Sequence, residues 1–339
     1  MKPFRISAVS GIRAAGVLVT LAALSLLRPT GVSAQSGPEA SDAASATEAA
    51  TFLLIPLGAR NVGFGGATAG AMGDVEGAVW NPAALAGIDE WAVYYHGADD
   101  FGTSTHAVGG VTSWGATKVG LSLLAVDLGT IDGRDAANNP IGTIDMANTL
   151  AILTLARSIS SQFDIGASYK FVRLGGSCQG CTGLEPDATG HAFDVAVSAR
   201  PDVFERLRVG LILSNLGGGM SLRSDGPSDP LPARVRLGGE IDILGPSVDR
   251  EVELRARADV QQTFTEFDDV DLFAGAEVGY RSIAFVRMGY AATGTGRSGA
   301  SLSVGVRHRG FGLDVGRRFD DFSDFESGFP FQLSVSYEP

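Results

Sequence analysis

Residues 311–317 read Phe311-Gly312-Leu313-Asp314-Val315-Gly316-Arg317, an alternation of apolar with non-apolar side chains. The same alternation occurs in residues 163–170, 251–260 and 331–337. Because successive side chains of a strand point to opposite faces, each of these segments is predicted to be a strand with one apolar and one polar face. The sequence therefore predicts an all-β protein.

About fourteen such segments follow one another, and most have the roughly nine to eleven residues that a tilted membrane strand needs. We place them at 90–98, 105–114, 117–128, 144–158, 163–174, 190–200, 206–216, 233–243, 251–263, 270–280, 283–292, 299–308, 311–320 and 330–338. Short connections, such as 115–116 and 309–310, alternate with longer ones at 97–104, 132–142, 174–187, 218–232, 292–299 and 320–330. Periplasmic turns and extracellular loops alternate in this way, so we predict a transmembrane antiparallel β-barrel of about 14 strands over residues 89–339. The alternative is a secreted β-sandwich.

The N-terminus has the pattern of a secretory signal peptide. Lys2, Arg5 and Arg13 precede an apolar run over residues 14–27, and a small-x-small cleavage site ends at Ala34. We predict a signal peptide over residues 1–34, with an uncleaved anchor as the alternative, and a disordered linker over residues 35–50. Export to the outer membrane follows from the leader and the barrel together.

The composition argues against several classes of protein. The net charge of −12 does not suit a nucleic-acid partner, which requires a basic face. The four histidines, at 96, 106, 191 and 308, are scattered without metal-ligand spacing, and no hydrolase or metalloprotease motif is present. Residues 294–299 match GxGxxG but lie between two predicted strands, which is a hairpin context. We therefore expect no enzyme activity, no metal and no cofactor.

Cys178 and Cys181 are the only cysteines, and they fall in a predicted outer loop. In an exported protein a local disulfide is the leading interpretation. A single CxxC supplies half of a zinc site, and zinc binding and a redox role remain as alternatives.

Charged residues occupy the non-apolar phase of several predicted strands and would face the barrel lumen. They are Arg236, Glu240, Asp242, Glu253, Arg255, Arg257, Asp259, Glu277, Arg307 and Asp314. Because both signs are mixed, a structural ion-pair network is favoured over a selective passage. Aromatic residues near predicted strand ends are expected to form interfacial girdles, namely Trp91, Tyr94, Tyr95, Trp114, Phe319, Phe322, Phe325 and Phe329.

Residues 51–88 form a glycine-rich block that precedes the predicted barrel. Three stretches stand out in it: residues 52–60 (FLLIPLGAR), 63–67 (GFGGA) and 80–86 (WNPAALA). In this order and spacing they resemble the FadL-type outer-membrane superfamily, and within it the PorV/PorQ family. The residues that carry the motif are Pro56, Gly58, Ala59, Arg60, Gly63, Gly65, Gly66, Trp80, Asn81, Pro82 and Ala83.

The resemblance implies that residues 51–88 fold inside the lumen as a plug. Glycines permit close backbone approach there, and Asn81-Pro82 would break a short helix. Arg60 and Asp74 are the charges expected to tie the plug to the wall or to each other. The alternative is an amphipathic periplasmic segment outside the barrel.

The resemblance also implies two candidate functions. The first is a structural or cargo-shuttle component of a type IX-like secretion system, with secretion components or secreted cargo as partners. The second is a FadL-like passive transporter of hydrophobic small molecules. An apolar pocket beside the plug would favour the transporter, whereas a lumen sealed by ion pairs would favour the secretion role. Either protein would contact outer-membrane lipids and the barrel assembly machinery. That machinery usually recognises an aromatic residue at the C-terminus, whereas this sequence ends in Tyr337-Glu338-Pro339.

Overall fold

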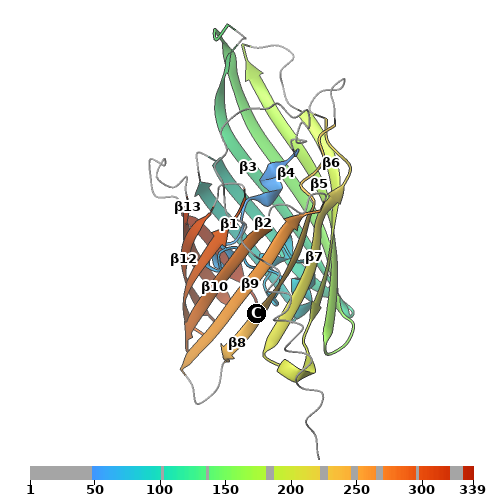
Figure 1. The fold of residues 1–339 in the computed structure, drawn as a ribbon, viewed down its shortest axis with the longest axis vertical. Helices are drawn as coiled ribbons and strands as arrows, with labels where there is room; N and C mark the ends of the chain where they lie inside the picture. Colours follow the sequence, from blue (N-terminus) through green and yellow to red (C-terminus); the bar gives the residue numbers. More distant parts are fainter. Residues whose placement is uncertain are drawn as a thin grey trace, which may run out of the picture. The chain divides into compact units, whose positions relative to one another are not determined.

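The computed structural model describes residues 48–100, 103–134, 137–180, 187–221, 228–245, 251–264, 270–294, 298–320 and 331–339. The predicted signal peptide and most of the predicted linker lie outside these residues. Fourteen strands form one closed antiparallel barrel, as predicted (Figure 1). The soluble sandwich alternative is wrong, because the sheet closes where β1 pairs with β14, from Val93 opposite Tyr337 to Ala98 opposite Gln332.

The strands follow one another around the barrel in chain order. They are β1 (Trp91–Asp100), β2 (Thr103–Trp114), β3 (Thr117–Arg134), β4 (Pro140–Ser158), β5 (Phe163–Gln179), β6 (Asp187–Ala199), β7 (Leu207–Gly217), β8 (Arg234–Leu244), β9 (Val252–Thr263), β10 (Val270–Tyr280), β11 (Ala284–Ala292), β12 (Gly299–His308), β13 (Phe311–Asp320) and β14 (Gln332–Tyr337). The helices are short: η1 (Thr51–Leu54), α2 (Ala59–Gly63), η2 (Gly77–Val79), η3 (Pro82–Gly87) and η4 (Asp202–Phe204). Among the described residues, none of the helices has the length and apolar character needed to cross a membrane.

Every predicted strand is present, but three are longer than expected. β3, β4 and β5 continue into residues that we assigned to loops, and they extend beyond the other strands at the top of Figure 1. Pairing resumes past a register shift, with Thr130 opposite Asp145 and Asp132 opposite Thr143. The first expected loop, 97–104, is likewise mostly strand. These extensions consist mostly of glycine and polar residues, so the period-two contrast that marks a half-buried strand is lost.

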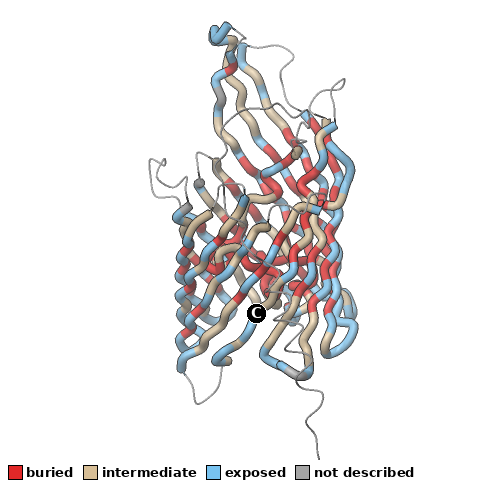
Figure 2. Tube along the Cα trace, in the orientation of Figure 1, coloured by how far each residue is buried: buried red, intermediate tan, exposed pale blue. Residues whose placement is uncertain are grey.

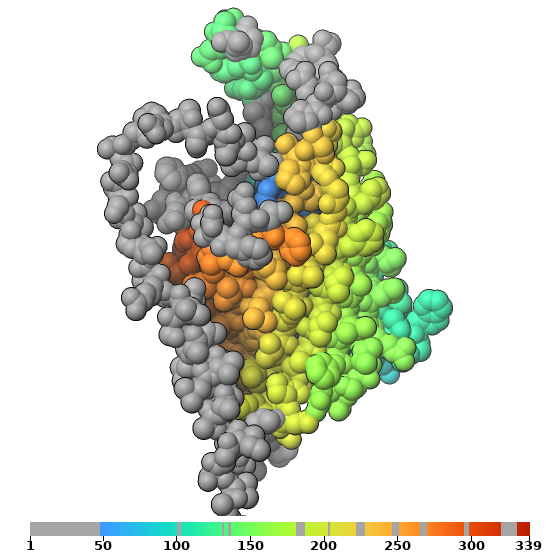
Figure 3. Space-filling view, turned by 45° about the vertical axis from the view of Figure 1, so that its right-hand side comes forward, coloured from blue at the N-terminus to red at the C-terminus, as the bar shows by residue number. Residues whose placement is uncertain are grey.

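Exposed and buried residues alternate along the strands (Figure 2). The exposed residues are the apolar ones: in β12, Leu302 is 41% exposed while its neighbour Ser303 is 1% exposed. Figure 3 shows one such outer surface, formed by successive strands from green through yellow to orange. Because a soluble protein would not leave so many apolar side chains exposed, this outer face suits bilayer hydrocarbon.

The inner face of the barrel has two different halves. From β7 to β13 it carries buried charges, as predicted. From β1 to β6 it is more apolar, and buried residues such as Leu124, Ile152 and Val172 belong to a hydrophobic cluster, although Lys170 and Asp194 form a buried ion pair there at 2.7 Å. This half of the lumen is therefore less polar than expected. The apolar half packs against residues that precede the barrel, including Leu57 and Leu85.

Several aromatic residues that we expected in interfacial girdles are exposed. Trp91, Tyr95, Trp114 and Phe319 are exposed on the outer face. The prediction is wrong for Tyr94, because this residue follows Val93 on the strand and faces inward, where it is 5% exposed. Phe322, Phe325 and Phe329 lie outside the described residues.

Candidate functional site

Residues 48–90, here called the inner segment, pack against side chains on the inner face of the barrel. The segment includes Glu48, which lies three residues before the predicted start of this block. Glu48 accepts hydrogen bonds from Arg234 of β8, and the backbone N–H of Ala49 donates to the carbonyl of Pro230 at 2.8 Å. The first residues of the segment (blue) are visible at the upper end of the barrel in Figure 3.

The Trp-Asn-Pro-Ala motif holds the inner segment together. Asn81 is the N-cap of η3: its side-chain oxygen accepts from the N–H of Ala83 at 3.0 Å, and Pro82 occupies the first helical turn. The Asn81 amide also donates to the carbonyl of Ala69 at 3.0 Å, and the Trp80 indole donates to the carbonyl of Leu57 at 3.3 Å. Pro82 thus begins a helix after η2 has ended, whereas we expected it to break one.

The Gly-Ala-Arg motif meets two acids of the same segment. Gly58 has a φ of 95°, and a Cβ atom there would lie 2.8 Å from a carboxylate oxygen of Glu76. Burial is the largest influence on Asp74 and disfavours its ionised form, but Arg60, Arg257, Arg307 and the N–H of Gly77 together lower the pKa of Asp74. Asp74 also accepts hydrogen bonds from the N–H groups of Glu76 and Gly77. Arg60 and Asp74 are therefore coupled to each other within the segment.

Buried polar side chains of the barrel fasten the inner segment. Asp259 of β9 accepts from the N–H groups of Thr68 at 2.6 Å and Ala69 at 2.9 Å. Arg236 of β8 donates to Thr68 and to the carbonyl of Gly66. The Ser334 hydroxyl of β14 accepts from the N–H of Ala59 at 3.0 Å.

Close backbone contacts add to these hydrogen bonds. A Cβ atom on Gly210 of β7 would lie 1.8 Å from the carbonyl oxygen of Ala69. One on Gly289 of β11 would lie 2.0 Å from the nitrogen of Gly65, and one on Gly63 would lie 2.0 Å from the hydroxyl of Ser303. We predicted the glycines of the segment but not those of the strands. A glycine on the inward phase in the middle of a strand is the signal that could have found them.

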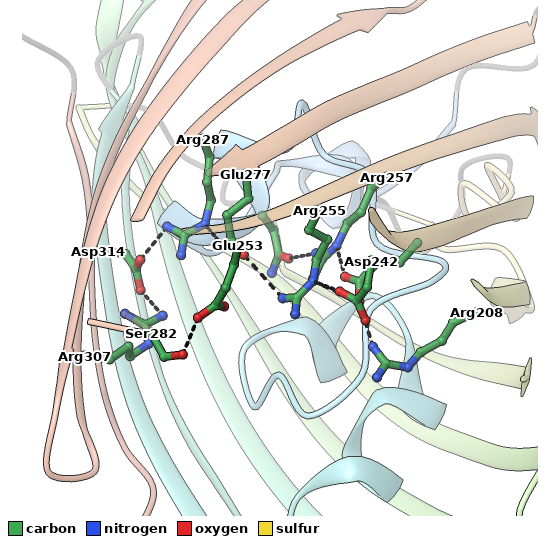
Figure 4. Close-up of polar contacts among 12 residues, drawn as sticks. Arg208, Asp242, Glu253, Arg255, Arg257, Glu277, Ser282, Arg287, Arg307 and Asp314 are labelled. Atoms are coloured by element: carbon green, nitrogen blue, oxygen red, sulfur yellow. Dashed lines mark hydrogen bonds and ion pairs between the residues drawn. The ribbon is translucent and has the colours of Figure 1, made fainter. Parts of the chain in front are cut away.

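The predicted lumen charges lie on the inner face, where most of them form ion pairs (Figure 4). Glu240 accepts from Arg257 at 2.6 Å and from Arg208 at 2.7 Å. Arg255 contacts Asp242 at 2.8 Å and Glu277 at 3.3 Å. Both signs alternate along the network, which is the arrangement expected of a structural role.

The network continues onto the last strands of the barrel. Arg287 bridges Glu277 at 2.6 Å and Asp314 at 2.7 Å, and Asp314 also pairs with Arg307 at 2.5 Å. Arg208 and Arg287 are members that sequence reasoning did not single out, although both are inward-facing arginines on predicted strands. Glu253 differs from the other predicted charges, because it accepts a hydrogen bond from the hydroxyl of Ser282 (Figure 4).

The other candidate residues do not come together. His96 is buried and bonded to Ser334, whereas His106 and His191 face outward and bond to Tyr95 and Tyr169. The described residues contain no group of three or more His, Cys, Asp or Glu side chains that could hold a metal ion. Cys178 is the second-to-last residue of β5 and is not a free thiol. Cys181 lies outside the described residues, so its pairing stays a prediction.

A cavity of about 570 Å³ lies between the inner segment and the barrel strands. Most of its lining is apolar, with contributions from η1 and from strand residues near the long connections. The principal apolar lining residues are Phe52, Leu54, Ile55, Pro56, Leu57, Trp80, Leu128, Met146, Leu174 and Phe273. A volume of this size is typical of a small-molecule site. Sequence patterns could not reveal it, because its walls come from distant segments.

Searches with the sequence found no matching family model and no matching curated protein. Solved structures do match the fold. The Ralstonia pickettii toluene transporter TbuX has a TM-score of 0.55 at 12% identity, covering 84% of this chain and 98% of that one. The CymD monoaromatic hydrocarbon channel has a TM-score of 0.56 at 12% identity, covering 84% and 97%.

A Pseudomonas aeruginosa FadL homologue matches in the same way, with a TM-score of 0.51 at 14% identity over 84% of this chain and 99% of that one. Each similarity covers nearly the whole length of the solved chain. The chain therefore has the fold of FadL-type outer-membrane barrels.

Proposed function

We propose that this protein is an outer-membrane barrel through which hydrophobic small molecules pass by diffusion, and that residues 51–88 act as a plug in its lumen. The observation that carries the proposal is the apolar cavity of about 570 Å³ beside the inner segment. Such a cavity is the feature expected of the transporter among the two candidate functions. The outward apolar face supports the membrane location.

The fold neighbours support the same choice. Two of them are described as a toluene transporter and a monoaromatic hydrocarbon channel. Neither the neighbours nor the described residues lend support to a PorV-like role in type IX secretion. The signal peptide and its cleavage near Ala34 remain predictions that belong to this proposal.

The two halves of the lumen have different roles in this proposal. The charged half, from β7 to β13, fixes the inner segment through directional bonds such as those of Asp259 and Arg236. The apolar half offers van der Waals contacts, which have no directional requirement, and Leu128 and Leu174 of this half line the cavity. An apolar molecule would gain contact there without breaking hydrogen bonds.

Uptake by cells tests the proposal. In a strain that lacks the protein, wild-type chain should restore uptake of labelled toluene, whereas Leu174→Trp should reduce it about tenfold by filling the cavity. Leu155→Trp is the matched control, because Leu155 is an outward-facing leucine of β4 with 47% exposure. Unchanged uptake on deletion, together with impaired protein secretion, would favour the secretion role instead.

A further inference from the structure

Three arginines line the otherwise apolar cavity: Arg234, Arg236 and Arg318. Two carboxylates, Glu48 and Asp271, line it as well. Arginine in an apolar pocket is the usual means of holding a carboxylate or a phosphate, because its guanidinium donates paired hydrogen bonds. Whether these arginines can do so depends on the partners that they already have.

Arg234 is already paired with a carboxylate. Its two terminal nitrogens donate to the two carboxylate oxygens of Glu48 at 2.6 and 2.7 Å, which is the bidentate geometry that an incoming carboxylate would need. Glu48 belongs to the inner segment and Arg234 begins β8, so the pair also fixes the start of the segment. A second carboxylate could bind Arg234 only by displacing Glu48.

Arg236 donates more hydrogen bonds within the protein than Arg234 does. Its Nε and Nη2 donate to the side-chain oxygen of Gln261 at 2.9 and 2.7 Å, and its Nη1 donates to Gly66 and Thr68. The guanidinium carbon also lies 4.5 Å from the centre of the Phe273 ring. Hydrogen bonds thus occupy the edge of this guanidinium, while an aromatic ring covers its face.

The remaining charged residues of the lining also have partners within the protein. Asp271 accepts from the Gln261 amide at 3.0 Å and from the N–H of Gly294 at 3.1 Å. Arg318 also has a partner. The charges of the lining are thus committed to the protein, and what remains for a ligand is apolar surface together with the neutral amides of Asn61 and Asn148. An ionised group would lose its water there without gaining a partner of opposite charge.

We propose that this cavity selects uncharged apolar molecules over carboxylates of similar size. This inference rests on the proposed function, because it concerns the ligand of the same cavity. Glu48 is the residue that sets the selectivity, since it occupies the arginine nearest to the start of the inner segment. Removing its charge should convert Arg234 into a carboxylate site.

Binding measured with purified protein tests the selectivity. The probes are octanoate and its methyl ester at pH 8, which share one hydrocarbon chain and differ in charge. Trp80 lines the cavity, so its fluorescence reports binding in a protein that carries Trp91→Phe and Trp114→Phe. The ester should bind at least about tenfold more tightly than octanoate, because only the anion must lose its hydration.

The Glu48→Gln variant should then bind octanoate about tenfold more tightly than the parent protein, with ester binding unchanged. Glu253→Gln is the matched control, because it removes a lumen carboxylate that does not line the cavity. Equal binding of both probes by the parent protein, or no gain for octanoate in Glu48→Gln, would overturn the selectivity alone. Failure of both probes to bind would overturn the proposed function as well.

Discussion

Glu76 is a buried carboxylate whose surroundings disfavour its charge. It is 4% exposed and lines a small polar cavity together with Arg60, Asp74, Arg307 and Asp314. Burial, followed by the negative charge of Asp74, raises the pKa of Glu76 well above its ordinary value of 4.5, while Arg307 opposes the shift. Asp74, two residues earlier, is stabilised as an anion. The pKa values of these two neighbours are therefore shifted in opposite directions.

This difference predicts how the seating of the inner segment depends on pH. Because the folded protein binds the Glu76 proton more tightly than the unfolded chain, the stability that it contributes is present below pH 4.5 and is lost as pH rises toward the raised pKa. The loss is about 1.4 kcal/mol per pH unit within that window. Glu76→Gln should remove it, so that hydrogen-exchange protection of the Ala59 amide no longer declines from pH 5 to pH 8. The exposed Glu205→Gln is the control, and an unchanged decline in Glu76→Gln would contradict the account.

At the scale of elements, the inner segment and several strands meet through close backbone contacts as well as through side chains. Gly210 of β7 touches the carbonyl of Ala69, and Gly275 of β10 would place a Cβ atom 2.5 Å from the Cα of Phe64. Such contacts leave no room for a methyl group. They explain why strand glycines occupy inward positions that a barrel without an inner segment would fill with larger side chains.

Gly210→Ala tests this contact. The added Cβ would lie 1.8 Å from a backbone oxygen, so we expect the variant to lose about 1–3 kcal/mol of the free energy that seats the inner segment. Limited proteolysis should then cleave residues 48–90 faster, while the folded barrel still migrates faster on unboiled gels. Gly218→Ala is the matched control, because nothing lies within 4 Å of a Cβ atom there. Equal cleavage of the two variants would show that the segment does not depend on this approach.

At the scale of the whole molecule, period-two alternation was enough to find all fourteen strands, because one face meets hydrocarbon wherever the strand crosses the membrane. It failed where that contrast disappears. In β3 the contrast is already weak at Leu124, which faces inward and packs in the hydrophobic cluster of the lumen, but residues 117–128 were still predicted as a strand. Beyond Leu128 the strand reads Gly-Thr-Ile-Asp-Gly-Arg, in which the alternation is lost, so its extension was not predicted.

The candidate site was predictable only in part. The motif residues of the inner segment and the lumen charges carry a signal in their own strand phase or spacing. Their partners do not: Arg287 joins Glu277 to Asp314 through pairing across neighbouring strands. The cavity depends on how the inner segment seats against β3 to β5, which no local pattern contains. The residues that line the lumen could therefore be predicted from the sequence, whereas the cavity between them depends on tertiary packing.

The same packing predicts how well the barrel holds back ions. The inner segment occupies the inward glycine positions of the wall, and the mixed ion pairs from Arg208 to Arg307 leave no ring of one sign to attract a permeant ion. In planar bilayers the wild-type protein should therefore conduct poorly. Deletion of residues 51–88 should raise the single-channel conductance at least about tenfold, because the lumen then loses the segment that fills it. Heat-modifiable migration must first show that the deleted protein still forms a barrel. A folded barrel without residues 51–88 that conducts no better than wild type would mean that the strands alone close the lumen, and residues 51–88 would then not be its plug.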